Sequence, residues 1–597
     1  MKTKKRQFVL TRRNRSFSGR NGFALAGVLL FTLIASLFAS AVLNTLSVHG
    51  ALIQDDYNYT RALYVAESGL NRASEALWIG FRNAGPDPLN RARWVDKFYR
   101  IADDVDIPVG TEGDTYSVAV RAIIGNRGSD ERMVVLEASG NALGGPSGTV
   151  PRKITRVMRY GHDQSGNFDY SYFTNNFGWF RRWGLLVNGD VRANGDITVT
   201  WPPIINGDMY AGINPDIGAS GSITGRPARA WNIDLYRQRA QPRWRPTSPE
   251  HDYAYEGGLT EFEFQDSLEM PYLSDANRLR QLAAAENGTV ASANQTINET
   301  IDGPVFLIGT KDDPIVIDGP VFVNGDVAIA GFVQGQGTIY ADRNIHIIGD
   351  IKYVTPPKFD HSSGADPTVS ENFNRNADFL GLVSNGNVIL GDYTMPWWFP
   401  IVGRFMTPPF TTPYKDDDGT AHSGDYTEFD GNKLDGTGRK LYESTWDDAT
   451  FQKIMAEARK VTTTFWGIPR QIDGMVYTNH LMAGWGLFTQ VNGSLTSRND
   501  AAQFFGRTQF NYDYRAKAEG NHYVDINLPK TANAEPVIWL EGEYELWSSK
   551  LRQMAKDQNM KYKEFKTSGS PKKPPKTKKP KKPKKNPKPK KNPKVSA

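Results

Sequence analysis

An uninterrupted apolar run near the N-terminus dominates the hydrophobic pattern of this chain. Phe23 to Leu43 reads FALAGVLLFTLIASLFASAVL and contains no charged residue. At about 1.5 Å per residue, a helix of this length spans roughly 30 Å, which is enough to cross the core of a bilayer. Because residues 1–22 hold eight Lys or Arg and no acid, they are expected to stay cytoplasmic, with everything after residue 43 outside. A secretory signal peptide is the alternative, although the run is longer than its usual apolar region.

A helical pattern continues beyond the apolar run. Apolar or small residues step by three and four along one face, at Leu43, Leu46, Gly50, Ile53 and Tyr57. After a slip of one residue the pattern resumes at Leu63, Ala66, Leu70, Ala73 and Leu77. The first helix-breaking pair is Gly85-Pro86. We therefore predict an amphipathic helical extension over residues 44–83 that offers its stripe to a partner.

The N-terminal region carries two motifs. A basic leader, residues 1–22, ends in Gly22-Phe23, where the apolar helix begins, and residues 62–73 read ALYVAESGLNRA. Together they resemble type IV pilins and pseudopilins, and the second resembles the AEAGL-type segment of X-subtype minor pilins. The resemblance implies that a prepilin peptidase cuts between Gly22 and Phe23 and that the helix packs against pilin-like subunits. Major pilins carry Glu where this chain has Gly27, which favours a minor, tip or uncleaved component.

Residues 84–165 contain strand-length runs rich in Val and Ile, namely Tyr116–Ile124, Met133–Ala138 and Lys153–Arg159. Turns containing glycine separate the first two runs and the last two, so an antiparallel sheet packed on the helix is the simple interpretation. Pilin-like heads resemble this arrangement in architecture. A generic α+β membrane-proximal domain remains the alternative.

A three-residue unit, an aliphatic residue followed by Asn or Asp and then Gly, recurs through residues 184–510. Its copies begin at Val187, Ile205, Ile301, Ile317, Val323, Ile472 and Val491. Asn-Gly and Asp-Gly take a positive φ at low cost, so each copy predicts a sharp corner. The spacings of 18, 16 and 19 residues between neighbouring copies favour the coils of a parallel β-solenoid, that is, a right-handed parallel β-helix. Antiparallel hairpins in a sandwich are the alternative.

Two insertions, residues 226–298 and 394–470, interrupt the repeats and are expected to leave one face of the body. Each is predicted to contain a short helix, over Ala276–Ala285 and Ala449–Val461. The second begins with an aromatic loop that is a candidate ligand-binding site for sugar rings, comprising Trp397, Trp398, Phe399, Phe405 and Phe410. The same residues are equally suited to capping an end of the solenoid, which is the simpler role.

Catalytic motifs are sparse in this sequence. The chain has no cysteine, no GxxxxGK[ST], no HExxH and no strand-linked GxGxxG, and its eight His are scattered, so we predict no cofactor and no metal site. Some polysaccharide lyases and hydrolases combine a β-helix with clustered carboxylates, and four acids follow corner glycines here: Asp190, Asp208, Asp326 and Asp350. Such residues more often stabilise turns. An enzyme is therefore the alternative to a non-catalytic protein.

Charge is divided unevenly along the chain. Residues 571–597 hold thirteen Lys, eight Pro and no acid, and subtracting these and the eight leader cations from the overall +6 leaves −15 for residues 23–570. The tail, 567–597, is expected to be disordered and extended. Anionic envelope polymers or lipid headgroups are its expected partners and nucleic acid is not; a merely solubilising tail is the alternative. Its candidate binding residues include Lys572, Lys573, Lys578, Lys579, Lys581, Lys582, Lys584, Lys585, Lys590 and Lys591.

The sequence thus predicts an α+β protein with a transmembrane helix over 23–43, a small sheet, a β-solenoid body, a helix-containing C-terminal cap over 511–566 and a disordered tail. We expect a single-pass membrane protein with its N-terminus cytoplasmic and its body periplasmic or extracellular. Its expected role is a non-catalytic, pilin-like component of a type IV pilus or pseudopilus, in assembly or adhesion. The alternative is an anchored β-helix enzyme that acts on an acidic polysaccharide.

Overall fold

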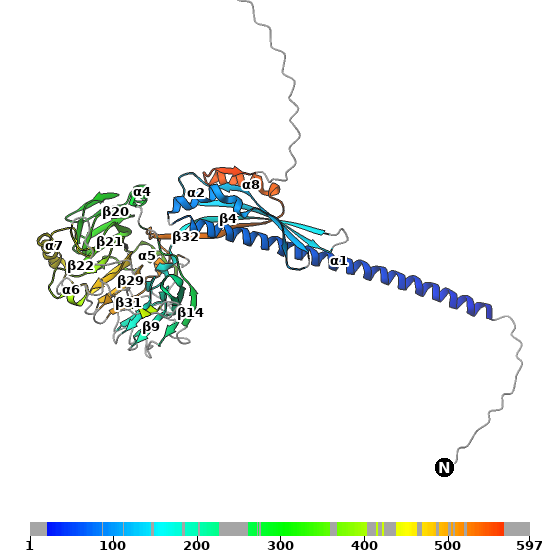
Figure 1. The fold of residues 1–597 in the computed structure, drawn as a ribbon, viewed down its shortest axis with the longest axis horizontal. Helices are drawn as coiled ribbons and strands as arrows, with labels where there is room; N and C mark the ends of the chain where they lie inside the picture. The colour runs from blue at the N-terminus through cyan, green and yellow to red at the C-terminus, as the bar shows by residue number, and fades with distance from the viewer. Residues whose placement is uncertain are drawn as a thin grey trace, which may run out of the picture. The chain divides into compact units, whose positions relative to one another are not determined.

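A computed structural model describes the chain from residue 21 to residue 565, apart from internal gaps (Figure 1). The gaps are residues 86, 112, 145–148, 182–184, 201–202, 226–260, 272, 274–275, 359–366, 403–413, 416–420, 423–437, 463–467, 485–488, 499–502, 505–507 and 519–521. The described chain divides into two compact units. The first comprises Met1–Asn83, Ala92–Tyr160 and Ala534–Ala597, and the second comprises Ala84–Arg91 and Gly161–Asn533.

One continuous helix, α1 (Asn21–Asn83, 63 residues), joins the apolar run to its predicted extension. It ends just before Gly85, whose φ of 99° no helix can accommodate. The second half of the predicted stripe is confirmed, since its residues Ala66, Leu70, Ala73 and Leu77 are buried. The first half is exposed at Leu46, Ile53 and Tyr57. The two halves of α1 therefore have different surroundings.

The first unit contains a six-stranded sheet in the order β1-β2-β3-β4-β32, with β33 paired to β2. Its strands are β1 (Asp104–Val109), β2 (Asp114–Ile124), β3 (Arg132–Leu143), β4 (Thr149–Gln164), β32 (Lys530–Glu541) and β33 (Tyr562–Glu564). The predicted strands β2, β3 and β4 pair in an antiparallel manner, as does β1 with β2. The antiparallel sheet predicted from the sequence is thus present, with further strands that were not predicted.

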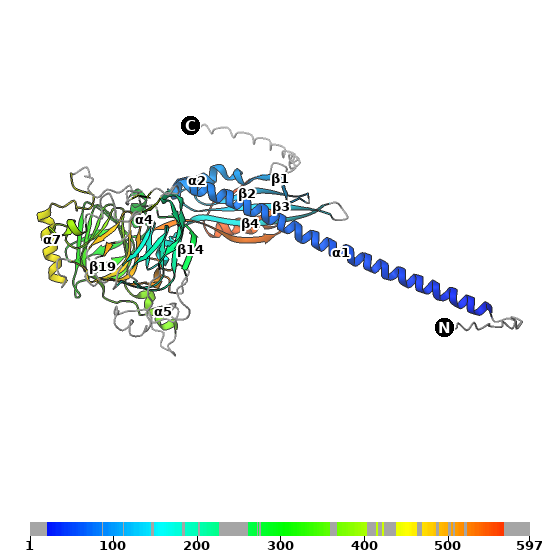
Figure 2. The ribbon, with the colours of Figure 1, turned by 60° about the horizontal axis from the view of Figure 1, so that its bottom comes forward.

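Helices cover both faces of this sheet (Figure 2). α1 packs on β2 and β3, and it approaches β3 so closely that a Cβ at Gly140 would lie 2.1 Å from the carbonyl oxygen of Ala62. Helix α8 (Tyr544–Asp557) packs its Leu551 and Ala555 on buried residues of β2, β3 and β4. Helix α2 (Pro88–Phe98) and the 3₁₀ turn η1 (Tyr99–Ala102) follow α1 in the chain.

The C-terminal segment 511–566, which the sequence presents as one cap, is divided between the two units. Residues up to Asn533 belong to the second unit, whereas Ala534 onward belongs to the first. β32 adds to the sheet beside β4, and β33 pairs with β2. The predicted helix of this segment is α8. These strands carry no repeated pattern, so the sequence gives no signal that they extend a sheet begun more than 370 residues earlier.

The second unit is rich in short strands. Its first run comprises β5 (Tyr172–Thr174), β6 (Gly178–Arg181), β7 (Leu185–Asn188), β8 (Val191–Ala193), β9 (Ile197–Thr200), β10 (Ile204–Asn206), β11 (Met209–Asn214), β12 (Ala219–Ser220) and β13 (Ile223–Thr224). Then follow β14 (Glu261–Asp266), β15 (Thr289–Ala291) and β16 (Thr296–Asn298). Its second run comprises β17 (Thr300–Asp302), β18 (Val305–Gly309), β19 (Ile315–Asp318), β20 (Val321–Asn324), β21 (Val327–Ala341), β22 (Ile345–Tyr353), β23 (Phe379–Ser384), β24 (Val388–Leu390), β27 (Gln471–Thr478), β28 (Met482–Gly484), β29 (Thr489–Ser497), β30 (Gln503–Phe504) and β31 (Thr508–Asn511).

Most strand pairs of the second unit are parallel. Within the described residues the antiparallel pairs are β11–β12, β15–β16, β15–β19 and the small β25–β26 pair (Tyr414–Lys415 and Ala421–His422). Aliphatic side chains from both runs form one buried cluster, among them Val187, Ile329 and Val491. Helices α4 (Ala276–Glu286) and α7 (Asp448–Val461) confirm the two helices predicted in the insertions, and α5 (Pro367–Asn376) and the short α6 (Trp398–Ile401) also lie in this unit.

The two runs meet in the middle of the body. β5 pairs with β29 on one side and β8 on the other, and β7 pairs likewise with β31 and β10. Strands β5 and β7 therefore stack directly on β29 and β31, although the paired residues are about 320 positions apart in the chain. The body is continuous in space but is assembled from two separate stretches of sequence.

Candidate functional site

The first half of α1 exposes an apolar surface. Within the described residues, α1 is the one helix long and apolar enough to cross a membrane, and its most apolar 18-residue window has a mean hydropathy of 2.0 with no residue buried. Large side chains along it, such as Phe31, Ile34 and Phe38, are more than half exposed. Exposing this much apolar surface to water is unfavourable, so this half of α1 requires a lipid or protein environment.

The second half of α1 is fixed to the sheet by an ion pair that the sequence analysis missed. Arg61 Nε and Nη2 each donate a hydrogen bond of 2.6 Å to the Asp114 carboxylate, and Leu143 N donates to the same group at 3.0 Å. Burial acts to raise the pKa of Asp114, but these hydrogen bonds outweigh it and lower the pKa below its usual value. The pair therefore stabilises the contact between α1 and β2 when Asp114 is charged.

We expect Arg61→Met to destabilise the first unit by about 2 kcal/mol at pH 7, because it leaves a buried carboxylate without its cation. The lowered pKa means that this stabilisation is present above about pH 4 and is lost as the pH falls through the folded-state pKa. The difference between wild type and variant in unfolding free energy should therefore shrink below pH 4. Arg72→Met, which removes an arginine 62% exposed, serves as the control. A difference that stays constant with pH would contradict the role assigned to Asp114.

The predicted processing site lies at the first described residues of the chain, and the predicted tail lies beyond the last ones. α1 begins at Asn21, so Gly22 and Phe23 are helical in backbone, while their side chains are outside the described residues. The predicted polyanion-binding lysines, Lys572 to Lys591, also lie outside the described residues. Both remain predictions.

The aromatic loop was a candidate ligand site, and its described members face the protein. Trp398 is fully buried, and its Nε1 donates to the carbonyl oxygen of Leu390. Trp397 is half-buried against the same cluster. The side chain of Phe399 and the residues Phe405 and Phe410 lie outside the described residues. Trp398 therefore contributes to packing, and its surface is not open to a ligand.

The repeated Asn and Asp residues form a hydrogen-bonded ladder across neighbouring strands. Asn188 Nδ2 donates to Asn511 Oδ1 at 2.8 Å, Asn511 Nδ2 to Asn492 Oδ1 at 2.8 Å, and Asn492 Nδ2 to Asp473 Oδ1 at 2.7 Å. Burial raises the pKa of Asp473 to about 6, although hydrogen bonds from Asn492, Gln471 and Tyr353 N oppose the shift. Three of the four ladder residues belong to the repeated unit found in the sequence, and the ladder fixes the register between strands.

Of the four carboxylates that follow corner glycines, those of Asp190, Asp326 and Asp350 make contacts within the fold. Asp190 accepts a hydrogen bond from the backbone N–H of Asp208 at 2.9 Å, and burial raises its pKa to about 6. Asp326 forms an ion pair with Arg343, and Asp350 forms one with Lys352 while accepting from Arg470 N at 2.7 Å. These contacts fit the structural role of acids that follow corner glycines.

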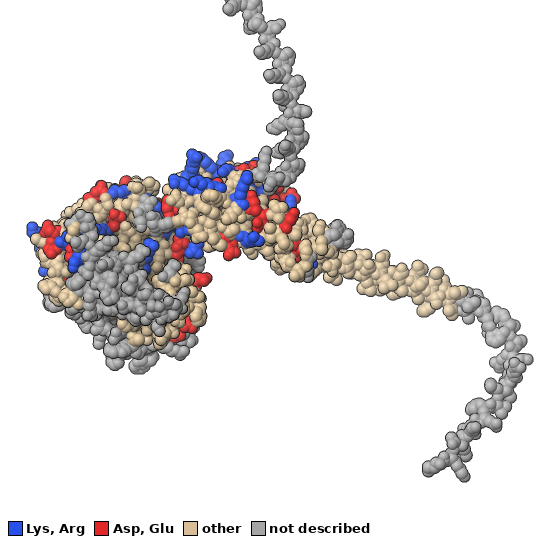
Figure 3. Space-filling view, viewed as in Figure 1, with Lys and Arg blue, Asp and Glu red and all other residues tan. Residues whose placement is uncertain are grey.

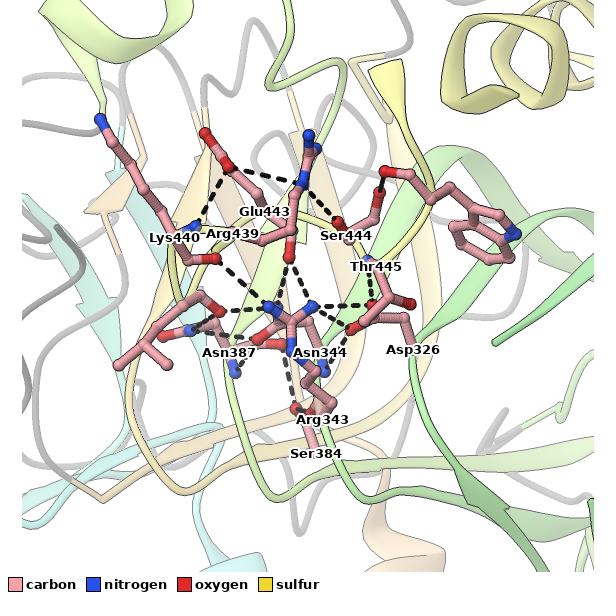
Figure 4. A network of polar contacts seen from close by, with 12 residues as sticks. Asp326, Arg343, Asn344, Ser384, Asn387, Arg439, Lys440, Glu443, Ser444 and Thr445 are labelled. Carbon is pink, nitrogen blue, oxygen red and sulfur yellow. Dashed lines mark hydrogen bonds and ion pairs between the residues drawn. The ribbon is translucent and has the colours of Figure 1, made fainter. Parts of the chain in front are cut away.

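A buried polar network joins the second insertion to the body (Figure 4). Asp326 accepts from Arg343 Nη1 at 2.8 Å, from Asn344 N at 3.0 Å and from Thr445 N at 2.6 Å. Arg343 in turn donates to the carbonyl oxygens of Glu443 and Lys440 at 2.6 and 3.2 Å. The described part of the insertion therefore lies against the body, with α7 packed over strands β18, β21 and β22.

Comparisons with known proteins give weak similarities. No protein-family model matches the chain, and no curated protein matches its sequence. Among solved structures, it is similar to the competence-associated pilin ComZ from Thermus thermophilus, with 9% identity and a TM-score of 0.24 over 81% of this chain and 98% of that one. It is also similar to an ice-binding protein from the Antarctic ascomycete Antarctomyces psychrotrophicus, with 13% identity and a TM-score of 0.17 over 59% of this chain and 98% of that one.

His346 lies beneath α7 beside the polar network. It is fully buried, and its ring contacts those of Tyr393 and Phe451, each at a centroid distance of 5.4 Å. Neither ring nitrogen has a hydrogen-bond partner in the described part of the chain. Burial lowers the pKa of His346 to about 4, so the imidazole is neutral near pH 7. It therefore packs as an aromatic side chain under the insertion.

The body and the first half of α1 differ in how their side chains are satisfied. In the body, the ladder and the Asp326 network connect interior polar groups to one another. The apolar first half of α1 is the longest exposed apolar stretch within the described residues.

Proposed function

We propose that this protein is a non-catalytic, membrane-anchored, pilin-like component of the cell envelope. The observation that carries the proposal is the division of α1. Its first half is apolar and exposed, while its second half is packed on an antiparallel sheet by a buried stripe and the Arg61–Asp114 pair. A continuous helix that is half anchor and half scaffold suits a protein held at a membrane by its N-terminus.

In this proposal the basic leader stays in the cytoplasm and the two folded units are periplasmic or extracellular. The exposed part of α1 contacts lipid and pilin-like subunits, and the protein acts in assembly of a type IV pilus or pseudopilus or in adhesion. The body acts as a parallel β-solenoid whose parallel strand pairs stack in register. The Lys/Pro-rich tail binds anionic envelope polymers by charge.

Fractionation and analysis of the mature N-terminus test this proposal together. We expect the native protein in the membrane fraction after an alkaline wash, with a mature chain that begins at Phe23 by mass spectrometry. Placing arginines at Leu33 and Leu37 should release it, because each charge near the bilayer centre costs about 3 kcal/mol. The matched control places arginines at Leu46 and Ile53, which are as exposed but lie beyond the predicted span.

Two results would contradict the proposal. Retention of the Leu33/Leu37 variant in the membrane would show that the apolar run is not the anchor. A mature chain that still begins at Met1, or one cut beyond residue 40, would remove the support for the pilin-like assignment. Release of the Leu46/Ile53 variant as well would show that the anchoring surface extends past residue 43.

A further inference from the structure

We propose that the first unit carries a folded binding surface for an acidic polysaccharide, separate from the tail. We call it the basic platform, and it comprises Arg93, Lys97, Arg100, Lys561 and Lys563. All five side chains are exposed. Figure 3 shows basic side chains gathered over α2 and beside α8.

Local geometry brings the platform residues onto one surface. Arg93, Lys97 and Arg100 follow one another at intervals of four and three, which places them on one side of α2 and its continuation η1. Lys561 and Lys563 come from the other end of the chain, where Lys561 directly precedes β33 and Lys563 lies within it. The two groups meet where Tyr99 stacks on Phe565, with ring centroids 4.0 Å apart.

Cations flank this aromatic pair on both sides. The Arg100 guanidinium lies 5.9 Å from the Tyr99 ring centroid, and Lys563 Nζ lies 5.0 Å from that of Phe565. Phe98 beside them is 53% exposed. An array of cations with aromatic surface between them suits a polymer that alternates carboxylates with the apolar faces of sugar rings.

Three acids lie near the platform, and two of them are paired with cations outside it. Asp96 is paired with Arg132 at 3.0 Å, and Glu564 with Arg552 at 2.6 Å. Asp103 accepts a hydrogen bond from Val120 N at 2.8 Å. Among the described residues, no ion pair involves any of the five platform cations; the pKa of Arg100 is raised by Tyr99 and, less strongly, by the charge of Asp103. The charges of the other four cations remain available to a ligand.

The sequence next to the platform points to the same chemistry. After Phe565 the chain continues through Lys566 into the run of thirteen Lys, whereas residues 23–570 carry a net charge of −15. The lysines that follow the platform in the sequence therefore supply further cations for the same polyanion. Point charges of Lys favour a long polymer over a single stereospecific ligand.

Binding of polygalacturonate to the full-length chain in neutral-detergent micelles tests this inference without depending on membrane anchoring. We expect the triple variant K97Q/K561Q/K563Q to bind about ten-fold more weakly at low salt, with a shallower salt dependence, because fewer counterions are released. The matched control K311Q/K358Q/K453Q removes three exposed lysines of the second unit and should change affinity less than two-fold. Arginine at the same three platform positions should preserve binding.

Three outcomes overturn the inference. Equal weakening by the two triple glutamine variants would show that net charge alone matters, and unchanged binding of the platform variant would assign all affinity to the tail. Tighter binding of duplex DNA than of polygalacturonate at equal charge concentration would overturn the choice of a polysaccharide. An unchanged unfolding midpoint of the platform variant is expected, since all three lysines are exposed.

Discussion

Replacing Gly493 by alanine is expected to destabilise the second unit by about 4 kcal/mol or more. A Cβ at this position would lie 1.9 Å from the carbonyl oxygen of Gly474 on the adjacent strand. The backbone φ of 154° also disfavours any residue with a side chain. Because Gly474 and Gly493 are register partners in the parallel pair β27–β29, hydrogen bonds on both sides hold the strands at a separation that leaves no room for a methyl group.

The urea midpoint of the full-length protein, followed by circular dichroism, measures this effect. Gly128→Ala is the matched control, since a Cβ there meets nothing within 4 Å, and it should change the unfolding free energy by less than about 0.5 kcal/mol. Equal midpoints for the two variants would show that the strands separate more easily than this geometry implies.

The repeated unit predicted strand stacking correctly in part, but the predicted corners are wrong for the copies at Ile472 and Val491, which lie inside strands β27 and β29. The units at Val187 and Ile205 are register partners, as are those at Ile472 and Val491. The units at Ile301 and Ile317 are not, because Ile301 pairs with Val323 and Ile317 with Gly335. The loop after Gly309 adds residues at one corner, which lengthens that repeat to 22 positions while the strands stay in register. The spacing of the units therefore revealed that the body is repetitive, but it did not identify every pair of units that are register partners.

Contacts between distant segments left no local signal in the sequence. The α1 stripe could be predicted because a period of 3.6 residues appears within one segment. The pairing of β5 with β29 and of β7 with β31 joins segments whose hydrophobic patterns give no indication of their partner. The basic platform could not be predicted for the same reason, since its five cations come from segments far apart in the sequence. The spacing of Arg93, Lys97 and Arg100 indicates only that these three share one side of a helix.

Arg343→Met is expected to destabilise the body by about 3 kcal/mol, because it leaves the Asp326 charge buried without a cation. Asp326 is fully buried, whereas the Arg343 side chain is 18% exposed. Thr445 N donates to Asp326 across 119 positions of sequence, so the loss should also loosen residues 440–445 of the insertion. Urea unfolding measures the first effect, and hydrogen exchange at the Thr445 amide measures the second.

The double variant Arg343→Met with Asp326→Asn separates the buried charge from the lost contacts. Asn344 N and Thr445 N both donate hydrogen bonds to Asp326 in the wild type. Asparagine at position 326 carries no charge, and its Oδ1 still accepts a hydrogen bond from one of these two backbone donors. The double variant should therefore recover about half of the roughly 3 kcal/mol lost in Arg343→Met, so the coupling in a double-mutant cycle should equal about 1.5 kcal/mol plus the stability lost in Asp326→Asn alone. A double variant whose loss equals the sum of the two single losses would show that Asp326 and Arg343 act independently. In that case the insertion would be held mainly by the apolar contacts of α7.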